Sequence, residues 1–247
     1  MNHHAPSFAQ PRRKLGKTAM LFVVATFVLA GLYLSPSAEA VKAVLLPAPD
    51  PQVTAGLAVP TVSQETAVFA GGCFWGIQAV FQHTKGVLNA VSGYAGGKAE
   101  DADYETVSGG GTGHAEAVQV TFDPRQVSYI QLLQIYFSVA HDPTQLNRQY
   151  PDSGTQYRSA VFTTTSAQRQ VTERYIAQLD AVHVFSHKIV TQISPLNDFY
   201  PAEKYHQNYA TVHPDASYIA RFDLPKIANL KSMMPALYRE QAALVAN

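Results

Sequence analysis

The sequence predicts an α+β fold, namely a split βαβ (ferredoxin-like) two-layer sandwich with long loops and a C-terminal helical extension. Strand-like and helix-like segments alternate along the chain, and long polar connections that contain glycine separate them. A hydrophobic fraction of 47% in 247 residues supplies enough apolar surface for a packed core. We therefore expect one sheet with helices on one of its faces, in a strand order that the sequence does not reveal.

The first expected elements begin at residue 65. Residues 65–70 are typical of a short strand, and residues 73–83 carry apolar side chains at the spacing of a helix. Residues 87–94 indicate a second strand. A long glycine-rich loop is expected over 93–113.

The later elements continue this alternation. Residues 114–124 alternate like a half-buried strand, and residues 128–140 predict a helix. Another strand is expected over 159–165, followed by a helix over 166–180 and a last strand over 188–194.

The N-terminal residues 1–40 are interpreted as a signal peptide or signal anchor. Four basic residues between positions 12 and 17 precede an uncharged stretch that ends in small residues, which is the order of a secretory signal. The apolar core, 19–34, is long for a cleaved signal but shorter than the roughly 20 residues that span a bilayer comfortably. An uncleaved membrane tether and, less favoured, a buried helix therefore stay open. Either leading interpretation predicts a periplasmic or otherwise exported protein.

The remaining domain limits follow from changes in composition. Residues 41–64 are rich in Pro and Ala without any period, which indicates a linker. The catalytic domain is expected over 65–214, and residues 215–247 predict a connector and a terminal helix. Eighteen basic residues balance eighteen acidic ones, so no nucleic-acid partner is indicated, and we expect a monomer.

Cys73 is the only cysteine of the chain, so it forms neither an internal disulfide nor a multi-thiolate zinc site. It is therefore either a buried apolar residue or a thiol that acts alone. Because it follows a strand and two glycines and precedes a helix, the first helical turn favours a negative charge on its sulfur. We expect a thiolate nucleophile there, with Phe74 and Trp75 as apolar walls for a small ligand.

Other residues give weaker signals. The stretch SGGGTGHAE lacks the ending of a phosphate-binding loop, and the histidines show no zinc-binding pattern. We therefore expect no cofactor and no metal. His114 and His141 are expected to support loops.

Four motifs occur in order along the chain: GGCFWG, GYAGG, GHAEAV and GTQYRS. Together they resemble the peptide methionine sulfoxide reductases of the A type, which reduce the S epimer of methionine sulfoxide. The resemblance covers 67–214, where the aromatic residues of 199–209 match the closing segment of the family and are expected mainly to pack. It implies reduction of methionine sulfoxide in proteins and as the free amino acid.

The resemblance also implies a role for each matching residue. Cys73 is the nucleophile and Glu116 the acid, which agrees with the strand pattern around Glu116, because burial favours the protonated form of a carboxyl group. Tyr104 and Tyr157 correspond to hydrogen-bond donors to the sulfoxide oxygen. Asp152 orients the site, although an Asp before Ser-Gly is explained nearly as well by a turn.

The wall and the reductant follow from the same resemblance. Phe74 and Trp75 correspond to the wall that receives the methyl group of the substrate. Many relatives carry further cysteines that attack the sulfenic acid formed on the nucleophile, whereas this chain has only one. It is thus similar to a single-cysteine variant that requires an external thiol, such as thioredoxin, glutaredoxin or glutathione.

Two other functions stay open at this point. A cysteine hydrolase or acyltransferase would use the same thiol after activation by a histidine. A non-catalytic domain would use the Trp75 pocket to bind methionine side chains.

Overall fold

The structure is a computed structural model that describes residues 42–55 and 61–246. The strands are β1 (Glu65–Ala70), β2 (Val87–Ala95), β3 (Ala115–Phe122), β4 (Arg148–Gln149), β5 (Asp152–Ser153), β6 (Ala160–Thr163), β7 (Gln192–Pro195) and β8 (Phe199–Pro201). The α-helices are α1 (Phe74–Gln82), α2 (Tyr104–Ser108), α3 (Tyr129–Ile135), α4 (Ser166–Ala181), α5 (Tyr209–Val212) and α6 (Leu224–Met233). Most of the predicted strands and helices therefore form.

The main sheet has six strands in the order β7-β6-β1-β3-β2-β8. β3 lies between β1 and β2 and is antiparallel to both, so α1 connects two strands that a third one separates. After α3, the chain returns as β6, which pairs antiparallel with the other side of β1. This is the split βαβ arrangement, and the predicted fold class is confirmed.

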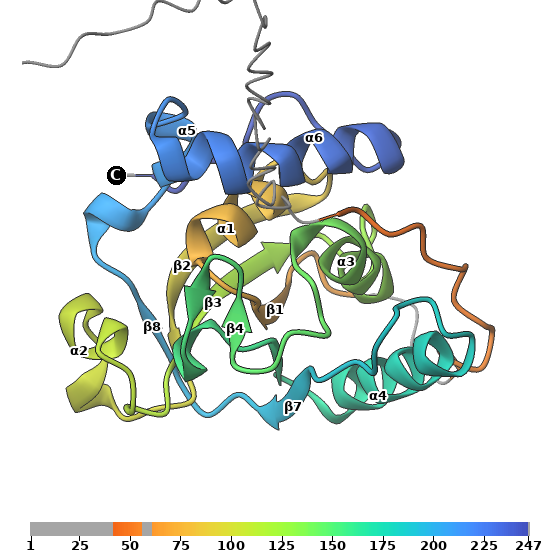
Figure 1. The fold of residues 1–247 in the computed structure, drawn as a ribbon. Helices are drawn as coiled ribbons and strands as arrows, with labels where there is room; N and C mark the ends of the chain where they lie inside the picture. The colour runs from red at the N-terminus through yellow and green to blue at the C-terminus, as the bar shows by residue number, and fades with distance from the viewer. Residues whose placement is uncertain (1–41, 56–60, 247) are drawn as a thin grey trace, which may run out of the picture. The chain divides into compact units, whose positions relative to one another are not determined.

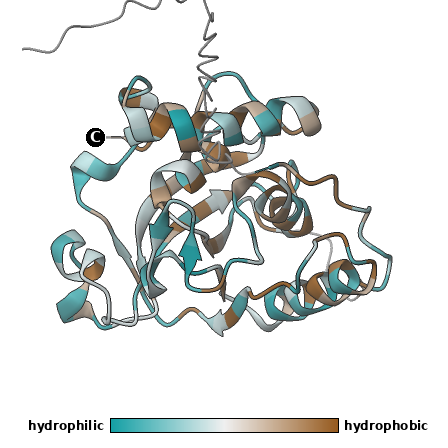
Figure 2. Ribbon diagram, in the orientation of Figure 1, coloured by the Kyte–Doolittle hydropathy of each residue, from teal (hydrophilic) through white to brown (hydrophobic). Residues whose placement is uncertain are grey.

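Helices cover one face of this sheet. Phe69 of β1 and Val118 of β3 belong to the main hydrophobic core, to which α1, α3 and α4 also contribute. The other face carries small residues such as Ala70 and Ala117, against which Phe199 packs. Figure 1 shows α5 and α6 next to α1, and α4 next to β7. In Figure 2, α4 carries both hydrophobic and hydrophilic residues, as expected of an amphipathic helix with one buried side.

The side-chain alternation of β3 decides where the predicted acid points. Val118 and Val120 face the helices as part of the main core. Glu116 lies two positions before Val118 and therefore projects from the same face of the sheet. Since Glu116 is only 2% exposed, the strand places a carboxyl group inside the helix-covered layer.

The expected loop over 93–113 is only partly a loop. β2 continues to Ala95, a 3₁₀ turn spans Ala99–Asp101, and α2 follows. The helix starts because the Asp103 carboxylate accepts a hydrogen bond from the Thr106 backbone N–H at 3.0 Å. The Asp103 N-cap was not predicted, because the whole segment was expected to be a loop on the basis of its glycines.

Two other elements are shorter than predicted. The helix expected over 128–140 is α-helical only to Ile135 and continues as a π-helical segment, Tyr136–Ala140. Of the strand expected over 188–194, only the last part forms, as β7, which pairs parallel with β6 at the edge of the sheet. An edge strand has a single partner, so the apolar pattern over 188–191 does not by itself extend it.

The described part of the expected linker has no helix or strand and is hydrogen-bonded to the domain. The Val44 backbone N–H donates to the carbonyl of Ser138 at 2.9 Å, and the Gln178 side chain donates to the carbonyl of Ala48 at 2.8 Å. The predicted signal or anchor, including 19–34, lies outside the described residues. Within the described ranges, no helix is long and apolar enough to cross a membrane.

The C-terminal extension contains the predicted helix, α6, and packs against α1 within the same compact unit as the sheet. Leu230 of α6 is fully buried. Near the end of the chain, the Asn208 side chain donates to the carbonyl of Val245 at 3.0 Å. The extension is therefore part of the packed structure that surrounds α1.

Candidate active site

Cys73 lies where β1 turns into α1. It is the N-cap residue of α1 and directly follows Gly72, whose φ of +91° is a conformation that glycine adopts readily. A Cβ atom at position 72 would also lie 2.6 Å from the Cβ of Gln149. The local sequence thus sets the sulfur at the helix start, as predicted, where the Trp75 backbone N–H lowers the pKa of the thiol.

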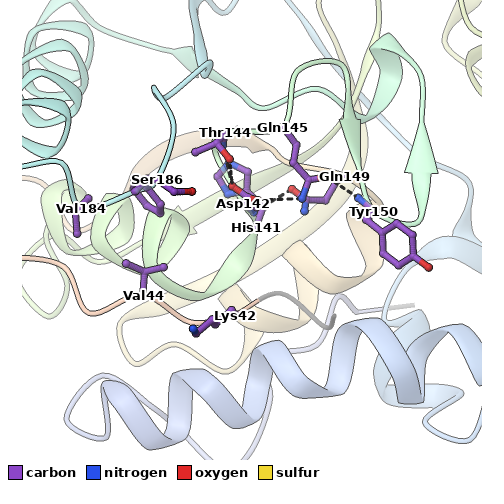
Figure 3. A pocket seen from close by; sticks show the side chains of 11 residues that line it. Lys42, Val44, His141, Asp142, Thr144, Gln145, Gln149, Tyr150, Val184 and Ser186 are labelled. Carbon is purple, nitrogen blue, oxygen red and sulfur yellow. Dashed lines mark hydrogen bonds between the residues drawn. The ribbon is translucent and has the colours of Figure 1, made fainter. Parts of the chain in front are cut away.

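A cavity lies beside the turn between β1 and α1, and several of the residues that line it support this turn. It has a volume of about 300 Å³, and His141, Asp142 and Gln149 are among the residues that line it (Figure 3). The Gln149 side chain accepts a hydrogen bond from the backbone N–H of Asp142 at 3.0 Å. His141 is buried, and burial lowers its pKa to about 4, so it is neutral and fixed between Tyr136 and other buried groups. His141 also packs against Gly71 of the turn, where a Cβ atom would lie 2.7 Å from its ring.

The electrostatic surroundings of Cys73 differ from the prediction. Burial raises the pKa of the thiol well above its usual range, and the carboxylates of Glu116 and Asp223 raise it further. The Trp75 N–H at the helix start lowers the pKa, but this effect is smaller than that of burial. The expectation of a thiolate is therefore wrong, because Cys73 is only 9% exposed and its thiolate loses more from desolvation than it gains from one helix end.

Glu116 has the properties of a proton donor. Its carboxylate oxygen Oε2 accepts a hydrogen bond from the Phe74 backbone N–H at 3.0 Å. Burial raises the pKa of Glu116 to about 8, with further contributions from the negative charges of Asp152 and Asp223, while the Phe74 N–H opposes the rise. At neutral pH the carboxyl group is therefore mostly protonated and lies directly beside the first turn of α1.

The predicted residues surround one cavity of about 170 Å³. Its lining residues are Cys73, Phe74, Trp75, Tyr104, Glu116, Asp152, Tyr157 and Tyr218. The structure thus brings together all seven predicted site residues, which come from four separate parts of the sequence. Tyr218 is an addition from the C-terminal extension.

The two predicted phenols reach the cavity from different segments. Tyr104 is the first residue of α2, and its backbone N–H donates to Glu203 at 2.9 Å. Tyr157 ends the 3₁₀ turn Thr155–Tyr157. Burial raises the pKa of both phenols, and the charge of Glu116 adds to this effect. Both hydroxyl groups therefore keep their protons and can donate hydrogen bonds.

Asp152 belongs to a two-strand hairpin, β4–β5, that the sequence analysis did not predict. The hydroxyl group of Tyr218 donates a hydrogen bond to its carboxylate oxygen Oδ2. Burial raises the pKa of Asp152, and the bond from Tyr218 opposes this rise. Asp152 is consequently held in the wall of the cavity rather than left as a solvent-exposed turn residue.

Phe74 and Trp75 form an apolar side of the cavity. Phe74 is fully buried, whereas Trp75 is partly buried and stacks on Tyr209 with ring centroids 4.0 Å apart. The indole N–H donates to Nδ1 of His206 at 3.2 Å. Tyr209 and His206 of the segment 199–209 therefore pack against this wall, in line with the expectation for that segment. Tyr205 is exposed, and Phe199 packs on the other face of the sheet.

Two of these residues were not identified from the sequence. Tyr218 is one of 13 tyrosines and lies in a segment without any recognisable motif, so no local signal indicates it. His206 lies in the matched segment 199–209, but the residues around it in the sequence do not indicate its hydrogen bond to Trp75. Within the described ranges, no group of three or more His, Cys, Asp or Glu side chains is arranged to hold a metal ion.

A buried thiol, a protonated carboxyl group and two phenols around one small apolar-walled cavity define the class: a cysteine enzyme that acts on a small group with an acceptor oxygen. Among the described residues that line the cavity, none is a histidine. A histidine-activated cysteine hydrolase would need one.

Comparison with known proteins gives the family. The family described as peptide methionine sulfoxide reductase matches residues 65–236, which include α6. A relative from Mesorhizobium japonicum, peptide methionine sulfoxide reductase MsrA 2, is 60% identical over 181 residues, or 73% of this chain and 93% of the relative. The corresponding MsrA of Deinococcus radiodurans is 52% identical over 172 residues, or 70% of this chain and 83% of the relative.

Solved structures agree with this match. Reduced Mxr1 from Saccharomyces cerevisiae has a TM-score of 0.58 and 30% identity, and covers 66% of this chain and 92% of its own. Methionine sulfoxide reductase A of Corynebacterium diphtheriae has a TM-score of 0.53 and 36% identity, and covers 71% of this chain and 88% of its own. The chain belongs to the peptide methionine sulfoxide reductase family, A type, and is an oxidoreductase that acts on a sulfur group.

Proposed function

We propose that Cys73 reduces the S-sulfoxide of methionine, in proteins and as the free amino acid, and becomes a sulfenic acid in doing so. The observation that carries this proposal is the position of Glu116: a protonated carboxyl group buried against the helix turn that starts at Cys73. A sulfoxide in the cavity offers an electrophilic sulfur to the thiol and a basic oxygen to the acid.

The reaction balances without a cofactor. The sulfur of Cys73 attacks the sulfoxide sulfur while Glu116 protonates the oxygen. As the two sulfurs bond, the sulfur–oxygen bond of the substrate breaks, and the oxygen leaves as water with the protons of Glu116 and the thiol. Water then attacks the sulfur of Cys73 and breaks the sulfur–sulfur bond, which releases the thioether, leaves a cysteine sulfenic acid and returns a proton to Glu116. Overall, a thiol and a sulfoxide yield a sulfenic acid and a thioether. The substrate sulfur is reduced by two electrons and that of Cys73 is oxidised by two.

Tyr104 and Tyr157 support this step as hydrogen-bond donors to the sulfoxide oxygen. Their pKa values are raised by burial, so the hydroxyl protons remain available as charge develops on that oxygen. Trp75, held by His206, fits the methyl group of the substrate, because an indole face offers apolar contact without a competing nucleophile. Asp152, held by Tyr218, orients the polar side of the cavity.

An external thiol is needed to complete the cycle, because the chain contains no second cysteine. The incoming thiol displaces water from the sulfenic acid and forms a mixed disulfide, and a second thiol then releases Cys73. A thioredoxin-like or glutaredoxin-like protein or glutathione has the required chemistry. The basic and apolar pattern of residues 1–40 favours an exported, periplasmic enzyme that is tethered through 19–34 if the segment is not cleaved.

The test is the mass of the purified protein after incubation with methionine S-sulfoxide and no reductant. We expect the addition of one oxygen atom per chain, the release of one methionine, and reversal by an added thiol. Cys73→Ala should show neither product while retaining the far-UV circular dichroism of the wild type. An unmodified wild-type protein, or acylation by an ester in place of oxidation, would refute the proposal.

A further inference from the structure

The C-terminal extension contains a buried ion pair that the reaction described above does not use. The Lys226 ammonium donates to Oδ1 of Asp223 at 3.1 Å, and the two side chains are 4% and 0% exposed. A second pair in the same extension, Lys231 with Glu240, has a comparable length of 2.8 Å but side chains that are 58% and 79% exposed. The first pair is therefore distinguished by its burial.

The Asp223–Lys226 pair lies directly against α1, the helix that begins after Cys73. A Cβ atom at Gly76 would overlap Oδ1 of Asp223 and would lie 2.7 Å from Nζ of Lys226. Gly76 is in the first turn of α1, three residues after Cys73. Only glycine allows the two charged side chains to approach the helix backbone so closely at this point.

One oxygen of the pair has no partner. Oδ2 of Asp223 is buried and makes no hydrogen bond to any described residue. A buried ion pair costs desolvation, and apolar residues of the same volume often stabilise a fold equally well or better. An incompletely bonded carboxylate is therefore poorly explained as a stabilising contact and well explained as a group that acts on its neighbours.

We propose that the Asp223–Lys226 pair sets the reactivity of Cys73 from beneath the first turn of α1, as two positioning residues supplied by the C-terminal extension. The inference rests on the proposed function only in taking Cys73 as the nucleophile. Through this pair the C-terminal extension, which contains no cysteine, contributes to catalysis by its charges.

Each charge of the pair has a different target. The carboxylate of Asp223 raises the pKa of both Cys73 and Glu116, so it favours protons on the nucleophile and on the acid. The ammonium of Lys226 lowers the pKa of Asp152 and so favours the carboxylate that accepts the bond from Tyr218. The pair thus favours the protonated form of the nucleophile and the acid, and the ionised form of the residue that orients the site.

Several titratable groups take part in this balance. Those that act on Cys73 or line its cavity are Glu116 from β3, Asp152 from β5, Asp223 and Lys226 from the extension, and the phenols of Tyr104, Tyr157 and Tyr218. A test must therefore change one charge and leave the others in place.

The test uses the single thiol of the chain as its own reporter. The rate at which iodoacetamide alkylates Cys73 is measured by mass spectrometry across the pH range for the full-length wild type, for Asp223→Asn and for Glu240→Gln as the exposed control. With Asp223→Asn, the midpoint should move to lower pH, and alkylation near neutral pH should be about threefold to tenfold faster, as expected when one nearby negative charge is removed. Glu240→Gln should match the wild type.

An unchanged alkylation midpoint in Asp223→Asn would overturn the proposal, and so would an equal shift in Glu240→Gln. Because Asp223→Asn leaves Lys226 without its partner, circular dichroism must confirm that the variant folds. If it does not, the double variant D223N/K226M removes both charges and should still lower the midpoint, since Asp223 is the member of the pair that acts on the Cys73 pKa. Alkylation requires no sulfoxide, so this result is independent of whether the proposed reduction occurs.

Discussion

Replacement of Glu116 by glutamine should make the protein more stable and much less active. Glu116 is ionised in the unfolded chain above its ordinary pKa of 4.5, but in the folded protein its pKa is about 8. Because the folded-state pKa is the higher one, Glu116 imposes no penalty below pH 4.5, and the penalty grows as the pH rises to about 8. Each pH unit in this range costs about 1.4 kcal/mol, which gives about 3 kcal/mol at about pH 7.

Glutamine removes this penalty with little change in shape. Its side-chain carbonyl can still accept the hydrogen bond that Phe74 N–H gives to the carboxylate at 3.0 Å. We therefore expect Glu116→Gln to raise the free energy of unfolding by about 3 kcal/mol near neutral pH and by almost nothing near pH 4. The rate constant of reduction should fall by about 10²- to 10⁴-fold, as for other lost general acids, with a smaller change in KM.

Urea denaturation followed by circular dichroism, repeated between about pH 4 and pH 8, measures the first effect. The difference between the two proteins isolates Glu116 from other titrating groups such as His141. Steady-state kinetics with methionine S-sulfoxide measures the second effect. If Glu116→Gln is as stable as the wild type throughout this range, or loses affinity instead of rate, Glu116 is not a buried protonated acid.

Three further substitutions test other parts of the site. Trp75→Phe removes the N–H donor to His206, so the wall should lose its fixed position and KM should rise about fivefold, for a bond worth about 1 kcal/mol; unchanged kinetics would mean that the wall does not contact substrate. Tyr218→Phe leaves Asp152 without its donor and should lower kcat/KM about tenfold, with unfolding followed as a control for a purely structural effect. Gly76→Ala forces a methyl group into the buried ion pair and should lower the free energy of unfolding by about 1–3 kcal/mol in urea, whereas a neutral result would contradict the close approach of the pair to α1.

The segments that were predicted well are those whose determinants are local. The turn before Cys73 and the start of α1 follow from two glycines and an apolar spacing that the neighbouring residues fully specify. The burial of Glu116 follows from the alternation of β3, because successive side chains of a strand point to opposite faces. The motifs then identified the family, and the structure places all the residues they indicated around one cavity.

The segments that were predicted poorly depend on distant partners. β8 and the β4–β5 hairpin are strands of two or three residues whose pairing partners, not their composition, define them. Tyr218 reaches the cavity only because the C-terminal extension packs on α1. No periodicity in that segment points to a site more than a hundred residues earlier in the chain.

The sequence by itself determined the chemistry that the protein can perform: a lone thiol at a helix start, an acid on a half-buried strand, phenols and an aromatic wall. Only the tertiary structure decided the surroundings that set the pKa values of these groups, and the packing of the last part of the chain against α1. The physical reason is that residue types and local backbone geometry are properties of short segments, whereas the pKa of Cys73 depends on how much water is removed and which charges lie near it. Those charges come from a strand, a hairpin and a C-terminal helix that meet only in the folded protein.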